Sequence, residues 1–303
     1  MKKSTNTYTL LSDSKLVSKY YRCGGNVFNV SSLHEFYHPV GTMDFAIKYV
    51  IEGTERYVIN NQAYDVNSGS YLLLNGAKEG HVEIGSKKDV KGICIYITPS
   101  LITEIVASLQ RPDTAYADPM LASFFYTDHF LENQYQSDYT FLGKQMQQLS
   151  AAVQGNLLSG DDIDIEFFYS ISEKLIADQV QVYKQLHAIP TLKPATRRAL
   201  YRKILRGREF IDAGFMLPLS IEDIARESMM SEYHFFRLFK KVFGISPHKY
   251  LLHKRLQAGK NLLQQQQTVS AAAIECGFAD IYSFSKAFKS HFGVSPSSVQ
   301  KKN

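Results

Sequence analysis

A duplicated stretch near the C-terminal end most constrains how this chain can fold. The segment EYHFFRLFKKVFGISP begins at Glu232, and the segment IYSFSKAFKSHFGVSP begins 49 residues later, at Ile281. A stretch repeated at a fixed offset indicates a duplicated supersecondary unit. Aligned at that offset, the copies share the identical pairs Tyr233/Tyr282, Phe235/Phe284, Phe239/Phe288, Lys240/Lys289, Phe243/Phe292, Gly244/Gly293, Ser246/Ser295 and Pro247/Pro296.

The spacing of the apolar residues predicts that each copy is an amphipathic helix, because side chains advance by about 100° per residue. Both outer faces carry cations and aromatic rings, which stay exposed unless a partner covers them. The inner faces collect Phe235, Leu238, Phe239, Val242 and Phe243 in the first copy and Phe284, Ala287, Phe288, His291 and Phe292 in the second. The outer faces collect Tyr233, Phe236, Arg237 and Lys240, and Tyr282, Ser285, Lys286 and Lys289.

A shorter helix precedes each copy after only a few linking residues. SIEDIARES begins with Ser220 as N-cap and Asp223 three positions on, a capping-box pattern, and Asp280 is a plausible N-cap for the second copy. Two helices joined by so tight a turn predict a helix-turn-helix, whose second helix fits the major groove of DNA. A plain helical bundle would explain the inner faces but not the duplicated outer ones.

A single helix over residues 247–263 is expected to join the two units. It would hold them about 25 Å apart or more, at about 1.5 Å per residue. That separation is compatible with successive major grooves about 34 Å apart.

The charge of the chain is divided along its length. The net charge is +5, but residues 1–194 carry 16 Lys and Arg against 21 Asp and Glu, whereas residues 195–303 carry 18 against 8. The first part is therefore net −5 and the second net +10. A basic module predicts a polyanionic partner, because neutralising phosphates releases counterions; solvated lysines alone would give the same balance.

At 303 residues the chain is expected to form at least two domains. Neither a signal-peptide pattern nor an apolar run of about 18 residues is present, so a cytoplasmic protein without a membrane span is expected. The three cysteines, Cys23, Cys94 and Cys276, are far apart and odd in number, which is typical of a reducing compartment.

The order of patterns predicts an α+β multidomain chain. Short β-branched and aromatic runs over residues 25–98 favour a small barrel or sandwich. Helical periods follow over residues 99–187 and include two apolar stripes, one from Phe167 to Leu186 and one from Phe141 to Val153. We expect domains at residues 1–187 and 196–303, a proline-bearing linker at 188–195, and helix-turn-helix units at 219–243 and 268–292.

The C-terminal segment resembles the DNA-binding domain of the AraC/XylS family of bacterial transcription regulators. The resemblance covers residues 196–300 and rests on Ala258, Leu262 and Leu263 in the joining helix, on Gly277-Phe278, and on the FGVSP of the second unit. Three positions depart from the family pattern: Met229 stands where Gly is frequent, Ala272 where a larger aliphatic residue is frequent, and Lys286 where Arg is common. The second helix is therefore expected to read bases more loosely.

The resemblance implies which residues contact double-stranded DNA. Base-reading positions fall at Tyr233, Phe236, Arg237, Ile281, Tyr282, Ser285 and Lys286. Phosphate contacts, which position the protein without specifying sequence, are assigned to Ser231, Lys240, Lys241, Lys254, Arg255 and Lys289.

The resemblance also implies a cupin-like β-barrel, with flanking helices, that senses a small organic effector. The candidate lining residues are Tyr49, Tyr57, Tyr71, His81 and Tyr96, although a plain aromatic core would account for any of them. A metal enzyme is the competing class, because cupins often hold a metal. No His-x-His occurs and His34, His38 and His81 are scattered, so neither catalytic residues nor a metal or other cofactor are expected.

A third hypothesis keeps DNA binding but gives the N-terminal domain only dimerisation or protein docking. The two apolar stripes would then supply a helix-to-helix homodimer interface, or else pack on the barrel of the same chain. We expect a non-enzymatic, sequence-specific transcription regulator, an activator that responds to an effector, dimerises through its N-terminal helices and contacts RNA polymerase.

Overall fold

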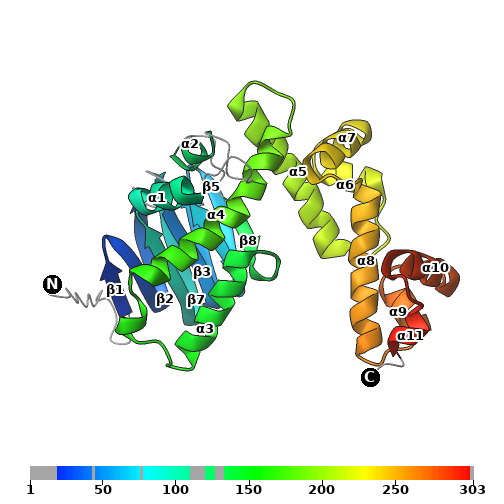
Figure 1. The fold of residues 1–303 in the computed structure, drawn as a ribbon, viewed down its shortest axis with the longest axis horizontal. Coiled ribbons are helices and arrows are strands. Elements are labelled where there is room, and N and C mark those ends of the chain that lie inside the picture. The colour runs from blue at the N-terminus through cyan, green and yellow to red at the C-terminus, as the bar shows by residue number, and fades with distance from the viewer. Residues whose placement is uncertain (1–18, 43–44, 76–77, 110–119, 127–132, 301–303) are drawn as a thin grey trace. The chain divides into compact units, whose positions relative to one another are not determined.

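The computed structural model describes residues 19–42, 45–75, 78–109, 120–126 and 133–300. The chain divides into two compact units, Met1–Tyr183 and Lys184–Asn303. The first contains the strands and the second is entirely helical in its described part (Figure 1). The expected order of a β domain followed by a helical domain is confirmed, whereas the predicted linker at residues 188–195 stays a prediction.

The N-terminal unit is built on an antiparallel sheet in the order β1-β2-β7-β3-β6-β8, with β4 pairing with β5 and β7. The long strands β2 and β7 pair along most of their length, with a register shift between Leu33 and Glu35. On its other side, β7 pairs with two strands: its residues 91–97 pair with β3 and its residues 80–83 pair with β4. The strands are β1 (Lys19–Cys23), β2 (Asn26–Thr42), β3 (Phe45–Glu52), β4 (Thr54–Ile59), β5 (Gln62–Asn67), β6 (Ser70–Leu74), β7 (Lys78–Ile97) and β8 (Asn133–Gln136).

Local sequence explains the tightest of these turns. Ile59 of β4 pairs with Gln62 of β5, so only Asn60 and Asn61 form the loop. Both asparagines have positive φ, 49° and 64°. Asparagine tolerates this left-handed region better than most residues, and a two-residue turn with two positive φ values matches the twist of a hairpin.

Alternation of side chains along the strands separates an interior from a helix-covered face. The interior is an apolar core with residues from β2 through β7: Leu33, Val40, Ala46, Val50, Tyr57, Ile59, Tyr64, Val66, Leu72, Leu74, Val82, Ile84 and Val90. Helices α3 (Phe141–Gln154) and α4 (Ile165–His187) lie across the other face of the sheet, the face opposite this core (Figure 1). The other helices of this unit are α1 (Pro99–Leu109) and α2 (Met120–Tyr126), and two short 3-10 turns lie at Ser137–Tyr139 and Gly160–Asp162.

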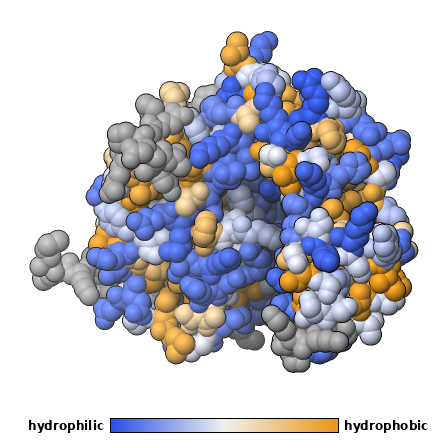
Figure 2. Space-filling model, turned by 45° about the vertical axis from the view of Figure 1, so that its right-hand side comes forward, coloured by the Kyte–Doolittle hydropathy of each residue, from blue (hydrophilic) through white to orange (hydrophobic). Residues whose placement is uncertain are grey.

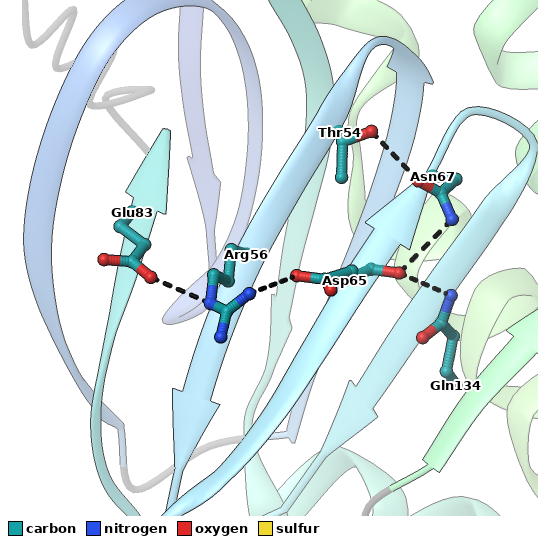
Figure 3. A network of polar contacts seen from close by, with 6 residues as sticks. All are labelled: Thr54, Arg56, Asp65, Asn67, Glu83 and Gln134. Carbon is teal, nitrogen blue, oxygen red and sulfur yellow. Dashed lines mark hydrogen bonds and ion pairs between the residues drawn. The ribbon is translucent and has the colours of Figure 1, made fainter. Parts of the chain in front are cut away.

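The outer face of β4 and β5 carries a polar network that Figure 3 shows in detail. Arg56 pairs with Asp65 of β5 at 3.3 Å and with Glu83 of β7 at 2.9 Å, so one guanidinium links three strands. Gln134 donates to the carbonyl of Asp65 at 3.0 Å. These groups are exposed, so each pair contributes little to stability, but their outward direction places the alternate residues Glu55 and Tyr57 inside.

The C-terminal unit contains the duplicated helices. Their predicted existence and order are confirmed by α6 and α7 for the first copy and by α9 and α10 for the second, with α8 between them. The helices are α5 (Pro194–Gly214), α6 (Ile221–Glu227), α7 (Glu232–Phe243), α8 (Pro247–Gln264), α9 (Val269–Glu275), α10 (Ile281–Phe292) and α11 (Pro296–Gln300).

Glycines let a long helix pack closely against α7 and another against α10. A Cβ on Gly207 of α5 would lie 2.5 Å from the ring of Phe235 on α7. A Cβ on Gly259 of α8 would likewise lie 2.7 Å from the ring of Phe284 on α10. Separations this short are not tolerated in a packed core. The duplication therefore extends to the helices that support each unit.

Candidate nucleic-acid interface

The second helix of the first helix-turn-helix unit, α7, is oriented by its apolar face; α7 and its counterpart α10, which the sequence predicts to enter the major groove, are called the recognition helices below. Phe235, Leu238, Phe239 and Val242 are buried, as the spacing predicts. The helix begins after Ser231 and ends at Gly244, which has φ 76° and donates its N–H to the carbonyl of Lys240. A left-handed glycine is a common helix stop. The buried face fixes the rotation of the helix about its axis, so the opposite face projects from the domain.

The projecting face of α7 carries a pre-arranged aromatic and cationic pair. Tyr233 is 71 % exposed, and Arg237 lies one turn further along the same face. Arg237 Nη1 donates to the Tyr233 hydroxyl at 3.3 Å, and its guanidinium lies 5.4 Å from the centroid of the ring. Lys240 and Lys241 are exposed, whereas Phe236 is half-buried. This face offers a fork of donors, an aromatic surface and two lysines to a partner.

The second recognition helix, α10, repeats the arrangement. Asp280 accepts a hydrogen bond from the backbone N–H of Ser283 at 2.6 Å, which confirms it as the N-cap. Phe284 and Phe288 are fully buried, and Tyr282 is 77 % exposed. Ile281, Lys286 and Lys289 are also exposed and Ser285 is half-buried. His291 was expected on the inner face but is exposed, with its ring 4.6 Å from that of His253 on α8.

The turns between the paired helices differ between the two units. Met229, in the first turn, has φ 50°, and Gly277, in the second, has φ 75°. A Cβ on Gly277 would lie 2.6 Å from the carbonyl oxygen of Met216. Met229 is exposed and its carbonyl accepts from Lys203 at 3.1 Å. The departure at Met229 noted in the sequence thus occupies a backbone conformation that favours glycine.

Two of the cations assigned to phosphate point instead toward their own domain. Lys254 Nζ forms an ion pair with Asp212 of α5 at 2.9 Å, and both side chains are largely buried. Arg255 donates to the carbonyls of Phe215 and Leu217 at 2.7 and 2.8 Å. These partners come from a segment some forty residues earlier and hold both cations in place. The assignment of Lys254 and Arg255 to phosphate contacts is therefore not supported by their placement.

The remaining cations are distributed over both recognition helices. Lys240, Lys241 and Lys289 are exposed, and Ser231 lies at the start of α7. Figure 2 shows hydrophilic residues spread over the visible surface, with hydrophobic residues scattered between them. Together with the net charge of +10 over residues 195–303, the exposed lysines give this unit the electrostatic character of a polyanion-binding domain.

The five residues predicted to line an effector pocket do not lie together. Tyr57 and Tyr96 point into the interior of the β unit. Tyr49 and Tyr71 point to the helix-covered face, where Tyr71 stacks on Tyr135 with centroids 5.2 Å apart. The physical reason is the two-residue period of strands, which sends odd and even positions of one strand to opposite faces.

The fifth residue, His81, lies apart from both groups. Its ring lies 4.9 Å from that of the exposed Tyr37, and its neighbour Val82 points into the core. The prediction of a single pocket lined by all five is therefore corrected.

A cavity of about 510 Å³ lies on the helix-covered face, near the end of α3. This volume lies within the range of small-molecule sites. Its walls are mostly apolar, and none of the five predicted residues lines it. It is lined by Tyr21, Val30, Ser31, Ser32, Ile51, Lys91, Val153, Gln154, Asn156 and Leu158. Sequence reasoning missed it because its lining comes from strands and a helix that are distant in the chain.

The two apolar stripes pack on the β unit of the same chain. Buried residues of α4 include Phe168, Ile171, Leu175 and Ile176. Phe167 meets Phe28 of β2 edge-on, with centroids 5.5 Å apart. In α3, Leu142, Met146 and Leu149 are buried in the same way. Packing on the β unit of the same chain accounts for the buried residues of both stripes, whereas Phe141 at the start of the second stripe is exposed, and dimerisation through these helices stays a prediction.

Metal and membrane sites were also considered. Within the described ranges, no group of three or more His, Cys, Asp and Glu side chains is placed to hold a metal ion. His34 instead contacts Asp89 at 2.7 Å. Among the helices that the structure describes, none is both long and apolar enough to cross a membrane.

Comparison with known proteins places both units. An AraC-like ligand binding domain model matches residues 29–164, and a helix-turn-helix domain model matches residues 224–302. The probable transcriptional regulator LumQ of Photobacterium leiognathi is 35% identical over 92 residues, which are 30% of this chain and 37% of LumQ. The lactose operon transcription activator of Staphylococcus xylosus is 26% identical over 151 residues, half of each chain.

A solved structure of an AraC-type transcriptional regulator from Chromobacterium violaceum is 32% identical, covers 33% of this chain and 90% of that chain, and has a TM-score of 0.32. The stretch of this chain that matches LumQ covers 37% of the length of LumQ, and the stretch that matches the lactose operon activator covers 50% of the length of that protein.

Proposed function

The chain belongs to the AraC family of transcriptional regulators, and on that premise we propose that it binds specific DNA sites and regulates transcription in response to a small organic effector. The observation that carries this proposal is the duplicated exposed face. Tyr233 on α7 and Tyr282 on α10 project beside cations, on helices whose rotation is fixed by buried phenylalanines. A bundle that served only to pack would not need this exposed surface twice.

In the proposed mode, α7 and α10 enter neighbouring major grooves. Helix α8 contains 18 residues, which span about 27 Å at 1.5 Å per residue. Arg237 can take a bidentate hold on guanine, and the Tyr233 and Tyr282 rings can pack on thymine methyl groups or sugars. Phe236, Ile281, Ser285 and Lys286 complete the proposed base-reading set.

Phosphate contacts in the proposed complex come from the exposed cations. Lys240, Lys241 and Lys289 lie on the same faces as the base-reading residues, so they can reach the backbone on either side of a groove. Their contacts add affinity for every sequence and make it sensitive to salt. Ser231 can add an uncharged phosphate contact from the start of α7.

The N-terminal unit is proposed to bind the effector. Its match to a ligand-binding domain model supports this role. Two places could hold a small molecule: the interior beside the polar side chains of Lys48 and Tyr96, and the cavity beside α3. An effector regulates only if it binds two states of the protein with different affinity. The alternative is a unit that only dimerises or docks a protein partner.

The proposal has four further parts. The protein dimerises through its N-terminal unit, contacts RNA polymerase, acts as an activator and is located in the cytoplasm. The name of the Staphylococcus xylosus relative supports activation. Most residues of the two apolar stripes pack against the β unit of the same chain. A dimer would therefore use the exposed faces of α3 and α4, where Phe141 at the start of α3 is exposed.

The test is selection of bound sites from a random DNA library by the full-length protein at physiological salt. We expect a motif with two informative blocks about one helical turn apart. Arg237→Ala should weaken the base preference within one block of the motif, and Lys286→Ala should weaken it within the other. If binding stays salt-sensitive but no motif is enriched, the repeat only grips phosphate and the proposal fails. Repeating the selection with pools of small metabolites tests the effector: an altered yield with one pool supports it, and unchanged yields with all pools favour the docking alternative.

A further inference from the structure

A cluster of titratable side chains lies inside the β unit, separate from the helices proposed to contact DNA. Lys48 of β3 is only 6 % exposed and Glu55 of β4 only 5 %. Lys48 Nζ donates to Cys94 Sγ at 2.7 Å and to the Tyr96 hydroxyl at 2.6 Å. The hydroxyl of Tyr57, also buried, donates to Glu55 at 2.5 Å.

The backbone holds these groups together. Lys48 pairs directly with Cys94 across the β3–β7 ladder, and Ala46 pairs with Tyr96 two residues further along. Lys48 and Cys94 are therefore directly opposed on the interior face, and Lys48 and Tyr96 are diagonal neighbours, which long side chains can still bridge. Gly92 of β7 leaves room for the Glu55 carboxylate, because a Cβ there would lie 2.5 Å from Glu55 Oε1. The arrangement is fixed by strand register rather than by flexible side chains.

The cluster keeps a cation beside a nucleophile. Burial acts to lower the pKa of Lys48, but its neighbours Cys94 and Tyr96 outweigh burial, and the pKa stands above its usual value. Cys94 and burial together raise the pKa of Tyr96 to about 12. At neutral pH, Lys48 is therefore an ammonium and Tyr96 a phenol, and both hold a proton within reach of Cys94 Sγ.

The other two cysteines lie in different environments. Cys276 is fully buried in the helical unit, where burial and the neighbouring Glu275 outweigh the effect of Arg255 and raise the pKa of its thiol to about 11. Cys23 on β1 is half-buried, as Cys94 is, but within the described part of the chain its thiol has no neighbouring cation. Thiols beside cations are the reactive ones, and thiols in apolar surroundings are inert. Cys23 and Cys276 therefore serve as internal controls for the reactivity of Cys94.

We propose that Cys94 is a site of oxidation by hydroperoxides, with Lys48 and Tyr96 as the groups that promote the reaction. A lone pair of Cys94 sulfur attacks one peroxide oxygen, the S–O bond forms and the O–O bond breaks. The leaving hydroxide takes a proton from the Lys48 ammonium, and the proton that the thiol loses restores that ammonium. The net reaction turns a thiol and hydrogen peroxide into a sulfenic acid and water; sulfur loses two electrons and the peroxide gains them.

The oxidation itself needs neither a bound effector nor DNA, and it involves the same interior side chains, Lys48 and Tyr96, that the proposed function offers as one of two places for an effector. It requires only a small oxidant that can reach a half-buried thiol. A sulfenic acid is reversible by thiols, so the modification is suited to a transient signal. Added oxygen at Cys94 would also disturb the two hydrogen bonds of Lys48 inside the unit.

The experiment exposes the reduced full-length protein to hydrogen peroxide together with dimedone, which traps sulfenic acids. Mass spectrometry then follows the peptides of all three cysteines with time. We expect trapping at Cys94 to be at least about tenfold faster than at Cys23, and Cys276 to remain unmodified. Equal rates at Cys94 and Cys23 would overturn the proposal.

Variants separate the chemistry from mere exposure. Lys48→Met keeps the length of the side chain but removes the ammonium, and should slow trapping at Cys94 by about tenfold or more without changing the rate at Cys23. Lys48→Arg should retain most of the wild-type rate, and Tyr96→Phe should slow it. A loosened β unit would expose Cys94 and speed trapping rather than slow it, so a loss of packing would not imitate the expected result. An unchanged or faster rate in Lys48→Met contradicts the role of the ammonium.

Discussion

Arg237 lies over the ring of Tyr233 on the exposed face of α7, with its guanidinium 5.4 Å from the ring centroid and its Nη1 3.3 Å from the hydroxyl. The two residues are one helical turn apart, so the contact needs no rearrangement of the backbone. A cation held against an aromatic ring loses less side-chain freedom when it binds. The pair therefore presents Arg237 to a partner in a restricted set of directions.

Arg237→Ala should weaken binding to the selected DNA site by about 1–3 kcal/mol and relax the preference at one base position. Lys240→Ala should instead weaken binding to all sequences alike and reduce the slope of log affinity against log salt by about 1. Fluorescence anisotropy with specific and random duplexes over a salt series measures both effects. Equal losses on both duplexes for both variants would show that the two residues do not differ in role.

Phe239→Ala should destabilise the helical unit by about 3–5 kcal/mol, because a fully buried aromatic ring is replaced by a cavity. Its ring contacts Phe235, Phe243 and Tyr250. Denaturant unfolding followed by circular dichroism gives the change, with Lys240→Ala as the exposed control, whose midpoint should stay where it is. An unaltered midpoint in Phe239→Ala would mean that α7 packs by another face.

Met229→Gly should stabilise the first helix-turn-helix unit by roughly 1 kcal/mol, because glycine adopts a positive φ without steric cost. Met229 is exposed, so little apolar burial is lost with its side chain. Met229→Ala is the matched control: it keeps the Cβ and should show no such gain. Thermal unfolding of the three proteins distinguishes them.

The converse change, Gly277→Ala in the second unit, should destabilise by more than about 1 kcal/mol. The new Cβ would meet the carbonyl oxygen of Met216 in addition to straining the backbone. The same unfolding measurement applies, and a neutral result would show that this turn can relax.

Asp223→Asn should lower the stability of the helical unit at neutral pH but not in acid. Hydrogen bonds from the hydroxyl and backbone N–H of Ser220 hold the pKa of Asp223 below its usual value. A lowered pKa stabilises the fold above the ordinary carboxyl pKa of about 4, and this contribution is lost as the pH falls through the lowered value.

The difference in unfolding midpoint between wild type and Asp223→Asn should therefore shrink as the pH is lowered below about 4. Glu222→Gln serves as control, since Glu222 lies in the same first turn but outside the capping box. A difference that persists unchanged in acid would contradict the role assigned to the carboxylate.

The duplicated helices could be predicted from sequence because their signals are local. The buried faces of α7 and α10, the capping box at Ser220 and Asp223, and the glycine stops at Gly244 and Gly293 all depend on residues within a few positions of one another. The order of a β unit before a helical one follows from the same short-range periods.

Side-chain partners from distant segments could not be predicted in this way. Lys254 and Arg255 have the sequence signature of phosphate-binding cations, but Asp212 and the carbonyls of Phe215 and Leu217 engage them. In the β unit, Tyr49 and Tyr57 look alike in sequence, but register sends one under the helices and the other into the interior. Lys48 meets Cys94 only because β3 pairs with β7.

The sequence by itself therefore determined which segments are helices or strands, that one supersecondary unit is duplicated, and which helical faces are apolar, because these properties follow from the period of the backbone. Only the tertiary structure decided which charged groups remain free and which are held by partners. It also decided which aromatic residues share a surface and where a lysine approaches a cysteine. The contacts of Arg255 and Lys48 join residues separated by 38 to 48 positions, and strand register and helix packing bring them together.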